Sequence, residues 1–453
     1  MVDKNSKGIG VCANTLLSFA IVDDDGLEHH RDVLSSQDIF LCFGTAELCQ
    51  TLSKVGLPLP ENLIDLKVEL SLLNNEIGLS GDSSWLKFSL SDMVLSSHIS
   101  IVAPDGTLWA NTLQSMSSQY IEQQSKEIAL RHARWLIALW KKHHHLIDID
   151  QALQRTHYSK YAYQISIQGF PVDINELNNA TVTEAVSARN IAKNIKNERC
   201  FGQITPWGTS TGRNSTSSSA YPLSIKSDYR KWFKPVSGRC FLHLDYHRAE
   251  IGIAAALSQD KNLLDLYLNG DPYSWLADQC TPAIELNKAK RLFISFQYGA
   301  MPSKELIGKI SLPAKTVKHL YSIYQAHFKQ YWSWTETVIE DACFDGYLTV
   351  SDGWRVAVTS NSSVLSIINF PTQAMGALIL REVVCQLGEQ HILPIGLNHD
   401  AVLFECACGE ATELAQQAKK AMQNVSQNLL GLELKVSIDI GQPGQSLFEV
   451  LEK

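Results

Sequence analysis

The chain has 453 residues, of which 45% are apolar and 19% are charged, and its formal net charge is −8. This length predicts two to four structural units, and the plentiful aliphatic and aromatic residues exclude intrinsic disorder as the general state. No apolar run is long enough to span a bilayer and the N-terminal residues lack a signal-peptide pattern, so we expect neither a membrane protein nor a secreted one.

The ten cysteines contain no CxxC pair. Cys406 and Cys408 are the most closely spaced, and they alternate along an expected strand. We therefore interpret the cysteines as reduced core thiols of a cytoplasmic protein, not as a zinc site or a disulfide framework.

Charge is unevenly distributed along the sequence. Residues 1–119 contain 15 acidic and 6 basic residues, whereas residues 200–320 contain 9 acidic and 15 basic residues. Because only the local field acts on a phosphate backbone, the basic middle leaves nucleic-acid binding open despite the negative total. Ordinary solvated surface is the alternative interpretation.

The N-terminal third predicts an α/β unit, with a strand at Leu16–Val22 and a helix at Thr45–Val55. Residues 126–145 predict an amphipathic helix with a basic C-terminal end, which suits the helix dipole. The histidines at 143–145 could bind a metal, although exposed residues at a helix end are the simpler interpretation.

Residues 161–177 predict a helix that Gly169 and Pro171 break, followed by a second helix that an aspartate caps. Residues 205–220 are rich in Ser, Thr and Gly and predict a loop, which is either a linker or a segment that turns Arg213 toward a ligand. Phe241–Tyr246 predicts a buried strand that runs directly into a helix.

Further along, residues 285–299 predict a helix that places three side chains four residues apart on one face. The remaining expected elements, in chain order, are a long helix (about 315–344), a hairpin that turns at Asp352-Gly353, a helix (370–388) and two strands (Ile395–Asn398 and Ala401–Cys406).

Two acidic residues dominate the expected chemistry. Asp245 ends the hydrophobic strand, and Asp400 lies in the tight turn between the last two strands. A carboxylate there is costly unless it is paired, hydrogen-bonded or bound to a cation. Mg²⁺ prefers such hard oxygen ligands together with substrate phosphates, so the pair could hold two ions that act on a 3′ hydroxyl and a leaving pyrophosphate. The alternative is that each aspartate caps a turn.

The helix over 285–299 carries Lys290, Ile294 and Tyr298 on one face. Lys290 could reach nucleotide phosphates, and the next two side chains could offer a surface to a base; an amphipathic helix with an exposed lysine is the alternative. Glu250 could exclude a ribose 2′-hydroxyl, or it could be an ordinary acidic residue in the first turn of a helix.

In this order, the segments resemble the family A DNA polymerases of the bacterial DNA polymerase I type. Residues 245–251 (DYHRAEI) are similar to motif A (DYSQIEL), residues 290–299 to motif B, and residues 397–401 (LNHDA) to motif C (VHDE). Residues 211–213 match the TGR that precedes motif A, residues 346–355 match the family's GY…T…GRR hairpin, and residues 369–373 match its NxPxQ helix start. The resemblance covers the C-terminal 240 residues well and the front only faintly.

The resemblance implies a role for each matching residue. Asp245 and Asp400 would be catalytic and would bind two Mg²⁺ ions, which Mn²⁺ could replace, with the Tyr246 carbonyl as a further ligand. Glu250, Lys290, Ile294 and Tyr298 would bind the incoming deoxynucleoside triphosphate, with Glu250 as the steric gate. The residues expected to contact primer-template DNA are Arg213, Gly299, Arg355, Asn369, Gln373 and His399.

Some positions depart from the family pattern. Leu286 replaces the arginine one turn before the motif B lysine, and Lys288 or Arg291 could partly compensate. Ile294 replaces an aromatic residue, which should alter sugar discrimination. Ala401 replaces the acidic residue after the motif C aspartate, and Leu365 also stands where an arginine is usual.

The resemblance implies an α+β right-hand polymerase fold, with an antiparallel palm sheet, helical fingers and a reduced thumb, after a small RNase H-like α/β exonuclease-type domain. The expected boundaries are listed here: exonuclease-like domain 1–147, polymerase 148–453, thumb 148–210, palm 211–257 and 340–453, fingers 258–339. Only about forty residues separate Gly169 from Gly212, which favours a rudimentary thumb and distributive synthesis. Asp65 survives from an exonuclease motif, but Gln124 replaces an expected acid, so we expect no proofreading.

The leading interpretation is a template-directed DNA polymerase that extends a primer 3′ end by two-metal-ion nucleotidyl transfer. The alternative is a catalytically weak or inactive accessory protein that binds DNA, motivated by the altered Leu286, Ala401 and Leu365. We expect the chain in the cytoplasm of a bacterial or phage-infected cell. The sequence does not indicate fidelity, pathway, a processivity partner or oligomeric state.

Overall fold

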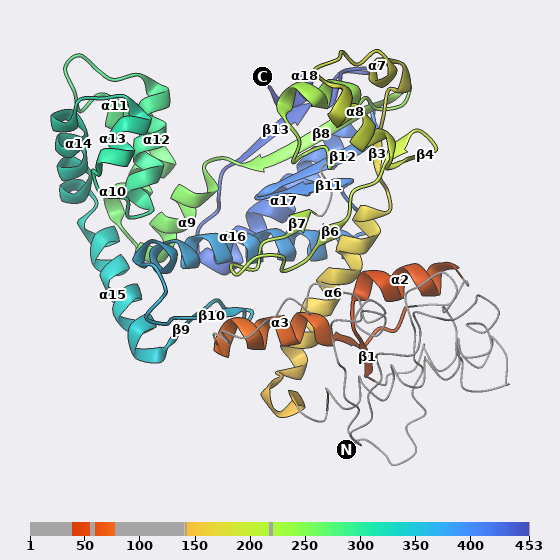
Figure 1. The fold of residues 1–453 in the computed structure, drawn as a ribbon, viewed down its shortest axis with the longest axis horizontal. Helices are drawn as coiled ribbons and strands as arrows, with labels where there is room; N and C mark the ends of the chain where they lie inside the picture. Colours follow the sequence, from red (N-terminus) through yellow and green to blue (C-terminus); the bar gives the residue numbers. More distant parts are fainter. Residues whose placement is uncertain (1–38, 55–58, 78–139, 141–142, 217–220, 453) are drawn as a thin grey trace. The chain divides into compact units, whose positions relative to one another are not determined.

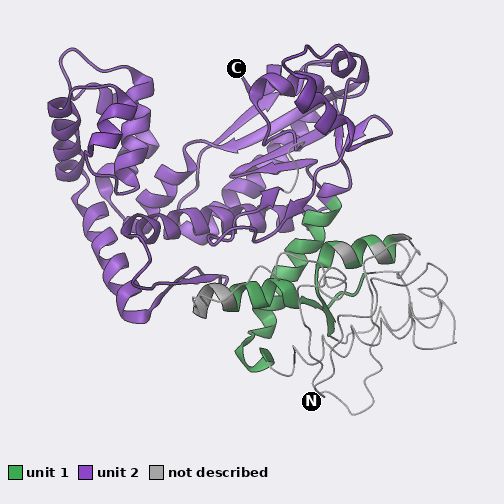
Figure 2. Ribbon diagram, viewed as in Figure 1, with its two compact units in different colours: residues 1–164 green, residues 165–453 purple. Residues whose placement is uncertain are grey.

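The computed structural model describes residues 39–54, 59–77, 140, 143–216 and 221–452. The chain divides into two compact units, residues 1–164 and 165–453 (Figure 2). The strand expected at Leu16–Val22, the motif from Tyr120 to Gln124 and most of the helix expected over 126–145 lie outside the described residues. The finer domain boundaries expected from the sequence stay predictions.

Unit 1 contains two short parallel strands, each of which leads into a helix. Its described elements are β1 (Phe40–Cys42), α2 (Thr45–Lys54), β2 (Leu63–Asp65), α3 (Leu66–Ile77), η2 (His144–Leu146) and most of α6 (Ile149–Ser166). The helix expected from Thr45 is confirmed. His144 and His145 are exposed on η2, and the described residues contain no group of three metal-ligating side chains.

Asp65 is held mainly by the backbone at the start of α2. Its side chain is buried, and its carboxylate accepts hydrogen bonds from the backbone N–H groups of Gly44 (2.9 Å), Thr45 (2.7 Å) and Lys67 (3.0 Å) and from the Thr45 hydroxyl (2.8 Å). These bonds satisfy both carboxylate oxygens, so Asp65 joins the start of α2 to the end of β2.

The core of unit 2 is a four-stranded antiparallel sheet with the order β11-β12-β8-β13 (Figure 1). Its strands are β8 (Arg239–Tyr246), β11 (Gly396–Asn398), β12 (Ala401–Ala407) and β13 (Val436–Ile440). Phe241, Leu242 and Leu244 of β8 are fully buried, as the hydrophobic run in the sequence predicts for a central strand. The expected strand over 241–246 and the two strands that flank Asp400 are confirmed.

Helix α17 (Ala411–Leu430) packs on this sheet, and two further core helices, α9 (Ala249–Ser258) and α16 (Val364–Glu389), pack against α17 and against each other. Helix α16 begins at Val364, six residues before the start expected at 370, because Ser363 caps it by accepting from the Ser366 N–H (3.1 Å). Pro371 therefore lies inside the helix. Among the described helices, α16 alone is long and apolar enough to span a bilayer, and most of it is buried in the core of unit 2.

A helical subdomain lies at one end of unit 2 (Figure 1, left). It comprises α10 (Lys261–Asn269), α11 (Pro272–Ala277), α12 (Leu286–Gln297), α13 (Lys304–Ile310), α14 (Ala314–His327) and α15 (Lys329–Asp345). The single long helix expected over 315–344 is wrong, because the chain breaks at Phe328. Asn262 donates to the last carbonyl of α14 (2.8 Å), and Asp260 accepts from the Tyr331 N–H at the start of α15 (2.9 Å).

Between Gly169 and Gly212 the chain forms only short elements, which are β3 (Phe170–Pro171), α7 (Ile174–Asn178), α8 (Ala185–Ala192), β4 (Ile195–Lys196), β5 (Arg199–Cys200) and β6 (Ile204–Thr205). Asp173 caps α7, which confirms the expected restart after Pro171. Five more elements are described in unit 2: β7 (Ser215–Thr216), η3 (Ser227–Trp232), the two strands of the hairpin β9–β10 (Tyr347–Thr349 and Arg355–Ala357) and α18 (Leu447–Leu451). No long helical hairpin occurs within this described stretch.

Candidate active site

Asp245 and Asp400 meet at one end of the sheet. Asp245 is the second-last residue of β8 and lies opposite Ala401, which follows Asp400 at the start of β12. The Tyr246 N–H donates to the Asp400 carbonyl (3.5 Å), and His399 adopts a left-handed conformation (φ +47°) in the turn before it. The expectation that the two aspartates adjoin is therefore confirmed.

The two carboxyl groups are partly buried and each affects the other. Burial raises the pKa of Asp400 well above its ordinary value, and the negative charges of Asp245 and Glu250 raise it further. Burial also raises the pKa of Asp245, against the opposing effects of His243 and of a hydrogen bond with Asp400. The pair is thus an acidic site whose ionised form needs a compensating cation.

The oxygen donors of this pair fit a hard divalent cation. Carboxylate oxygens are its preferred ligands, and a cation between Asp245 and Asp400 would offset the cost of ionising two desolvated carboxyl groups side by side. Glu250 is the next carboxylate, and a substrate's phosphates could complete the ligand shell. Tyr246 is fixed beside them, since its hydroxyl donates to the Met422 carbonyl (2.6 Å).

Arg213 and Glu250 form an ion pair (3.0 Å) beside the aspartates. Glu250 lies in the first turn of α9, and Arg213 directly follows Gly212, whose φ of +72° turns the backbone. Burial lowers the pKa of His399, and the charge of Arg213 lowers it further, which places the Arg213 guanidinium near the His399 ring. The described part of the expected loop, residues 205–216, thus brings Arg213 into the site instead of acting as a plain linker.

A cavity of about 290 Å³ lies between Asp400 and the helical subdomain. Its walls include Asp400, Glu250 and Arg213 from the sheet side, Ile294 from α12 and Tyr273 from α11. The Lys290 Nζ lies 5.8 Å from the Tyr273 ring centroid. The face of α12 predicted to bind a nucleotide is therefore turned toward the acidic pair.

Tyr298 and Gly299 end α12 against α16. Burial raises the pKa of the Tyr298 hydroxyl, and Glu250 raises it further while Gln373 lowers it, so both side chains lie near that hydroxyl. Gly299 has φ +78°, and a Cβ there would lie 2.8 Å from the Ile368 side chain. Only glycine fits this turn without strain or displacement.

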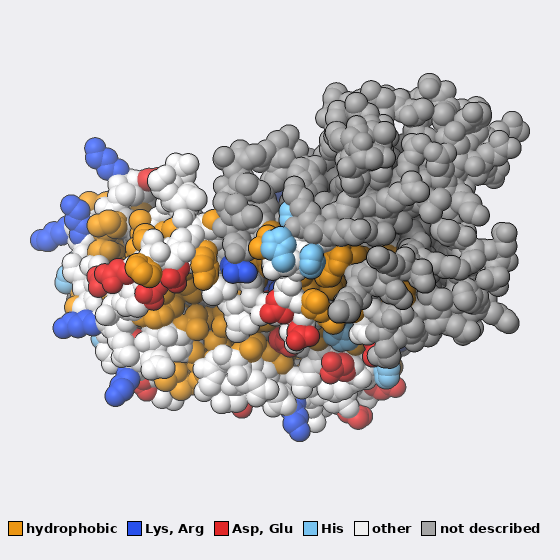
Figure 3. Space-filling model, turned by 90° about the horizontal axis from the view of Figure 1, so that it is seen from below, with side chains coloured by type: hydrophobic (Ala, Val, Ile, Leu, Met, Phe, Trp, Pro, Cys, Tyr) orange, Lys and Arg blue, Asp and Glu red, His pale blue; other side chains and the backbone are white. Residues whose placement is uncertain are grey.

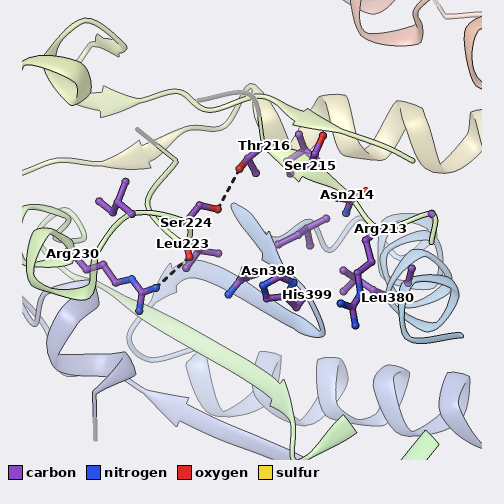
Figure 4. A pocket seen from close by; sticks show the side chains of 15 residues that line it. Arg213, Asn214, Ser215, Thr216, Leu223, Ser224, Arg230, Leu380, Asn398 and His399 are labelled. Atoms are coloured by element: carbon purple, nitrogen blue, oxygen red, sulfur yellow. Dashed lines mark hydrogen bonds between the residues drawn. The ribbon is translucent and has the colours of Figure 1, made fainter. Parts of the chain in front are cut away.

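A second cavity, of about 490 Å³, lies on the other side of Arg213 and His399, which line both cavities (Figure 4). Asn398 and Arg230 reach it from β11 and η3, and Thr216 and Ser224 bond to each other across it (3.2 Å). Its lining is rich in hydrogen-bond donors, which suits a phosphate backbone or base edges.

The remaining predicted DNA-binding residues lie farther along the chain's surface. Arg355 is on β10, 5.7 Å from the Tyr347 ring, and is not among the residues that line either cavity. Asn369 is on α16, and its buried Oδ1 accepts no hydrogen bond from any described residue. The structure thus brings together most of the predicted set but not Arg355.

Figure 3 shows one face of the molecule, on which the described basic side chains stand apart from one another and apolar ones fill much of the area between them. Among the side chains described there, no continuous basic patch forms. Three basic groups of the middle segment, Arg213, Arg230 and Arg248, instead line the two cavities.

Two arginines were missed in the sequence analysis. Arg248 adopts a left-handed conformation (φ +56°) between β8 and α9, and it lines the first cavity. Arg381 is buried in α16, donates to the Gly212 carbonyl (2.7 Å) and pairs with Asp352. Arg248 could have been noticed in the sequence, because motif A has glutamine at that position. Arg381 could not, because its partners lie far away in sequence.

Comparisons with known proteins agree with this site. The model of DNA polymerase family A matches residues 171–445. The DNA polymerase I, thermostable, of Thermus thermophilus is 25% identical over 269 residues (53% of this chain, 32% of its own length), and the DNA polymerase of Mycobacterium phage L5 is 25% identical over 234 residues (50% and 38%).

In a search of solved structures, the POL domain of Pol1 from M. smegmatis, in complex with DNA primer-template and dNTP, aligns with a TM-score of 0.71. It is 16% identical, and the alignment covers 93% of this chain and 88% of that one, so it shows the same fold. The chain spans about a third of the length of the thermostable relatives it matches.

Proposed function

Because the chain belongs to DNA polymerase family A, we propose that it extends a primer 3′ end with deoxynucleotides selected by a template strand. The observation that carries the proposal is the meeting of Asp245 and Asp400 beside the face of α12 that carries Lys290. The relative from M. smegmatis was solved with the substrates this reaction requires.

In this proposal, Asp245, Asp400 and the Tyr246 carbonyl hold two divalent cations, for which Mg²⁺ is the expected ion. When bound, these ions would lower the pKa of a primer hydroxyl and neutralise charge on the leaving pyrophosphate. The two carboxylates must both be ionised to bind them, so cation binding releases the proton that burial and the neighbouring negative charges favour on Asp400.

The other residues of the first cavity would position the nucleotide. Lys290 supplies a positive charge for its phosphates, and Ile294 lies along the same helix face. Glu250 would exclude a 2′-hydroxyl, and its ion pair with Arg213 holds its carboxylate in a fixed place. Tyr298 would lie against the templating base at the end of α12.

The second cavity would hold the primer end. His399 and Arg213 line both cavities, so a strand that passes from one to the other would contact both side chains. Gln373, which lies near Tyr298, would contact the adjoining base pair. Gly299, Arg355 and Asn369 are proposed to contact the template strand.

Primer extension with all four deoxynucleoside triphosphates and Mg²⁺ tests this function, with Asp245→Ala as the control. We expect extension by the unchanged chain and none by the variant. An inactive accessory protein is the competing proposal, motivated by Leu286, Leu365 and Ala401. DNA binding without extension, in a folded sample, would favour that proposal and overturn ours.

A further inference from the structure

Helix α12 lacks the arginine that relatives carry one turn before the motif B lysine. Leu286 occupies that position and is 53% exposed. Lys288, which could have compensated, pairs with Glu285 (2.7 Å), and Arg291 donates to the Lys309 carbonyl (2.8 Å). Both are therefore engaged at the exposed side of the helix, while Lys290 lies over the Tyr273 ring.

Arg248 provides a second positive charge at the same ring. Its guanidinium carbon lies 4.8 Å from the Tyr273 ring centroid, and the Lys290 Nζ lies 5.8 Å from it. Arg248 lines the cavity that Asp400 also lines, and only 18% of its side chain is exposed. The two cations thus reach the same ring from different elements, one from the turn between β8 and α9 and one from α12.

The backbone at Arg248 is held in a conformation that non-glycine residues rarely adopt (φ +56°). Such conformations persist where the surrounding structure enforces them, often at functional sites. Asp271 contacts the side chain of Arg248, not its backbone: its Oδ2 accepts from an Arg248 NH2 group, while its Oδ1 caps α11 by accepting from the N–H groups of Tyr273 (2.9 Å) and Ser274 (2.7 Å).

We infer that Arg248 binds the triphosphate of the incoming nucleotide together with Lys290, and so replaces the arginine that α12 lacks. This inference rests on the proposed function. A guanidinium offers five donors in a planar fork, so the contact with Asp271 leaves donors for phosphate oxygens. With an arginine in the motif A turn in place of one on α12, the chain would still present two cations to the phosphates of one substrate.

The test measures dNTP KM and kcat at saturating primer-template for three variants. Arg248→Gln restores the residue of motif A, Asp271→Asn breaks the same ion pair from its other side while keeping a capping oxygen, and Arg291→Gln removes a cation of α12 that faces away. We expect Arg248→Gln to raise KM about tenfold with little change in kcat, as loss of a charge-assisted phosphate contact predicts. Asp271→Asn and Arg291→Gln should leave KM within about twofold, the scatter expected for a surface change.

An unchanged KM in Arg248→Gln would overturn the inference. So would an equal rise in Asp271→Asn, because Arg248 would then act only as a brace between the sheet and α11. A rise confined to Arg291→Gln would assign the role to α12 instead. Melting temperatures of all variants show whether a change in KM reflects partial unfolding.

A binding measurement separates this inference from the proposed function. The affinity of the primer-template complex for a non-hydrolysable deoxynucleoside triphosphate is measured at equilibrium, without turnover. If the chain binds the analogue but never extends a primer, the proposed polymerase activity fails, while a roughly tenfold weaker affinity in Arg248→Gln still supports the arginine's role. Equal affinity in both proteins overturns that role whatever the activity.

Discussion

Asp245 and Asp400 occupy a site that costs the folded chain stability. A buried carboxyl group with a raised pKa disfavours the folded state once it ionises, because the unfolded chain ionises it in water. Most residues that adjoin Asp245 in β8 and Asp400 just before β12 are apolar and buried, so nothing in the packing requires an acidic residue at either position. The sequence pointed to both residues for this reason, and the structure adds that their charges act on each other.

We expect Asp400→Asn to raise the melting temperature of the cation-free protein while it abolishes extension. The pKa of Asp400 is raised in the folded state, so its contribution to stability is complete below its ordinary pKa and is lost as pH rises through the raised value. The increase in melting temperature of the variant over the unchanged chain should thus be largest at pH 8 to 9 and should vanish near pH 4. Each kcal/mol of unfolding free energy that is recovered should raise the melting temperature by roughly 2–4 °C. Thermal scans in EDTA check this. An advantage that is equal at both ends of the range would show that Asp400 is not strained by its charge.

Helices and strands differ in how far the sequence predicted them. The hydrophobic strand before Asp245 and the two around Asp400 appear where expected, since their apolar runs and turn residues are local signals. The predictions of one unbroken helix over 315–344 and of a helix that starts at 370 were wrong. The break at Phe328 depends on Asp260 and Asn262, which are far away in sequence. The earlier start of α16 depends on a Ser363 cap, which the match of residues 369–373 to a helix start obscured. Arg381 escaped prediction for the same reason as Phe328.

Arg381 joins three elements that the family motifs mark separately. It donates to the Gly212 carbonyl before Arg213, pairs with Asp352 of the hairpin turn, and lies 5.2 Å from the Trp207 ring. The Trp354 indole N–H donates to the Ser210 carbonyl beside it (2.9 Å). The loop that carries Arg213 is therefore fastened to α16 and to the hairpin at once.

We predict that Arg381→Met lowers the free energy of unfolding by about 3–5 kcal/mol, because it leaves the carboxylate of Asp352 buried without its partner. The double variant Arg381→Met/Asp352→Asn should recover part of that loss, since no unpaired charge then remains. Denaturant titrations of the two variants measure both effects. A loss below about 1 kcal/mol in the single variant would mean that the pair contributes as little as an exposed ion pair.

At the scale of the whole molecule, the short stretch from Gly169 to Gly212 decides how the chain would hold DNA. Its elements are a five-residue helix, an eight-residue helix and two-residue strands. Such elements offer little surface to a duplex, and binding that relies on few phosphate contacts dissociates readily. We therefore predict distributive synthesis.

The measurement is extension of a labelled primer in the presence of excess unlabelled DNA as a trap. We expect only a few nucleotides, on the order of ten or fewer, per binding event because few contacts retain the duplex. Hundreds of nucleotides per event would contradict the prediction and would point to a grip elsewhere on the molecule.

We predict separately, from Asp65 in unit 1, that the chain has no 3′–5′ proofreading activity. Asp65 uses both carboxylate oxygens for hydrogen bonds with Gly44 and Thr45 at the start of α2 and with Lys67 in its own turn, so it has no need of a metal to be satisfied. Purified protein incubated with labelled single-stranded DNA and Mg²⁺ should leave its 3′ end intact. Steady shortening that Asp65→Ala abolishes, without loss of the unit's fold, would refute this.

The central claim is that Asp245 and Asp400 form one cation-dependent centre for template-directed synthesis. The most direct measurement is single-nucleotide incorporation opposite each of the four template bases, with the unchanged chain and with Asp400→Asn. The account predicts that the inserted nucleotide follows the template base and that the rate falls at least about a thousandfold in a variant that remains folded, as loss of an electrostatic catalytic group predicts. Incorporation by Asp400→Asn at the original rate, or insertion that ignores the template, would contradict it.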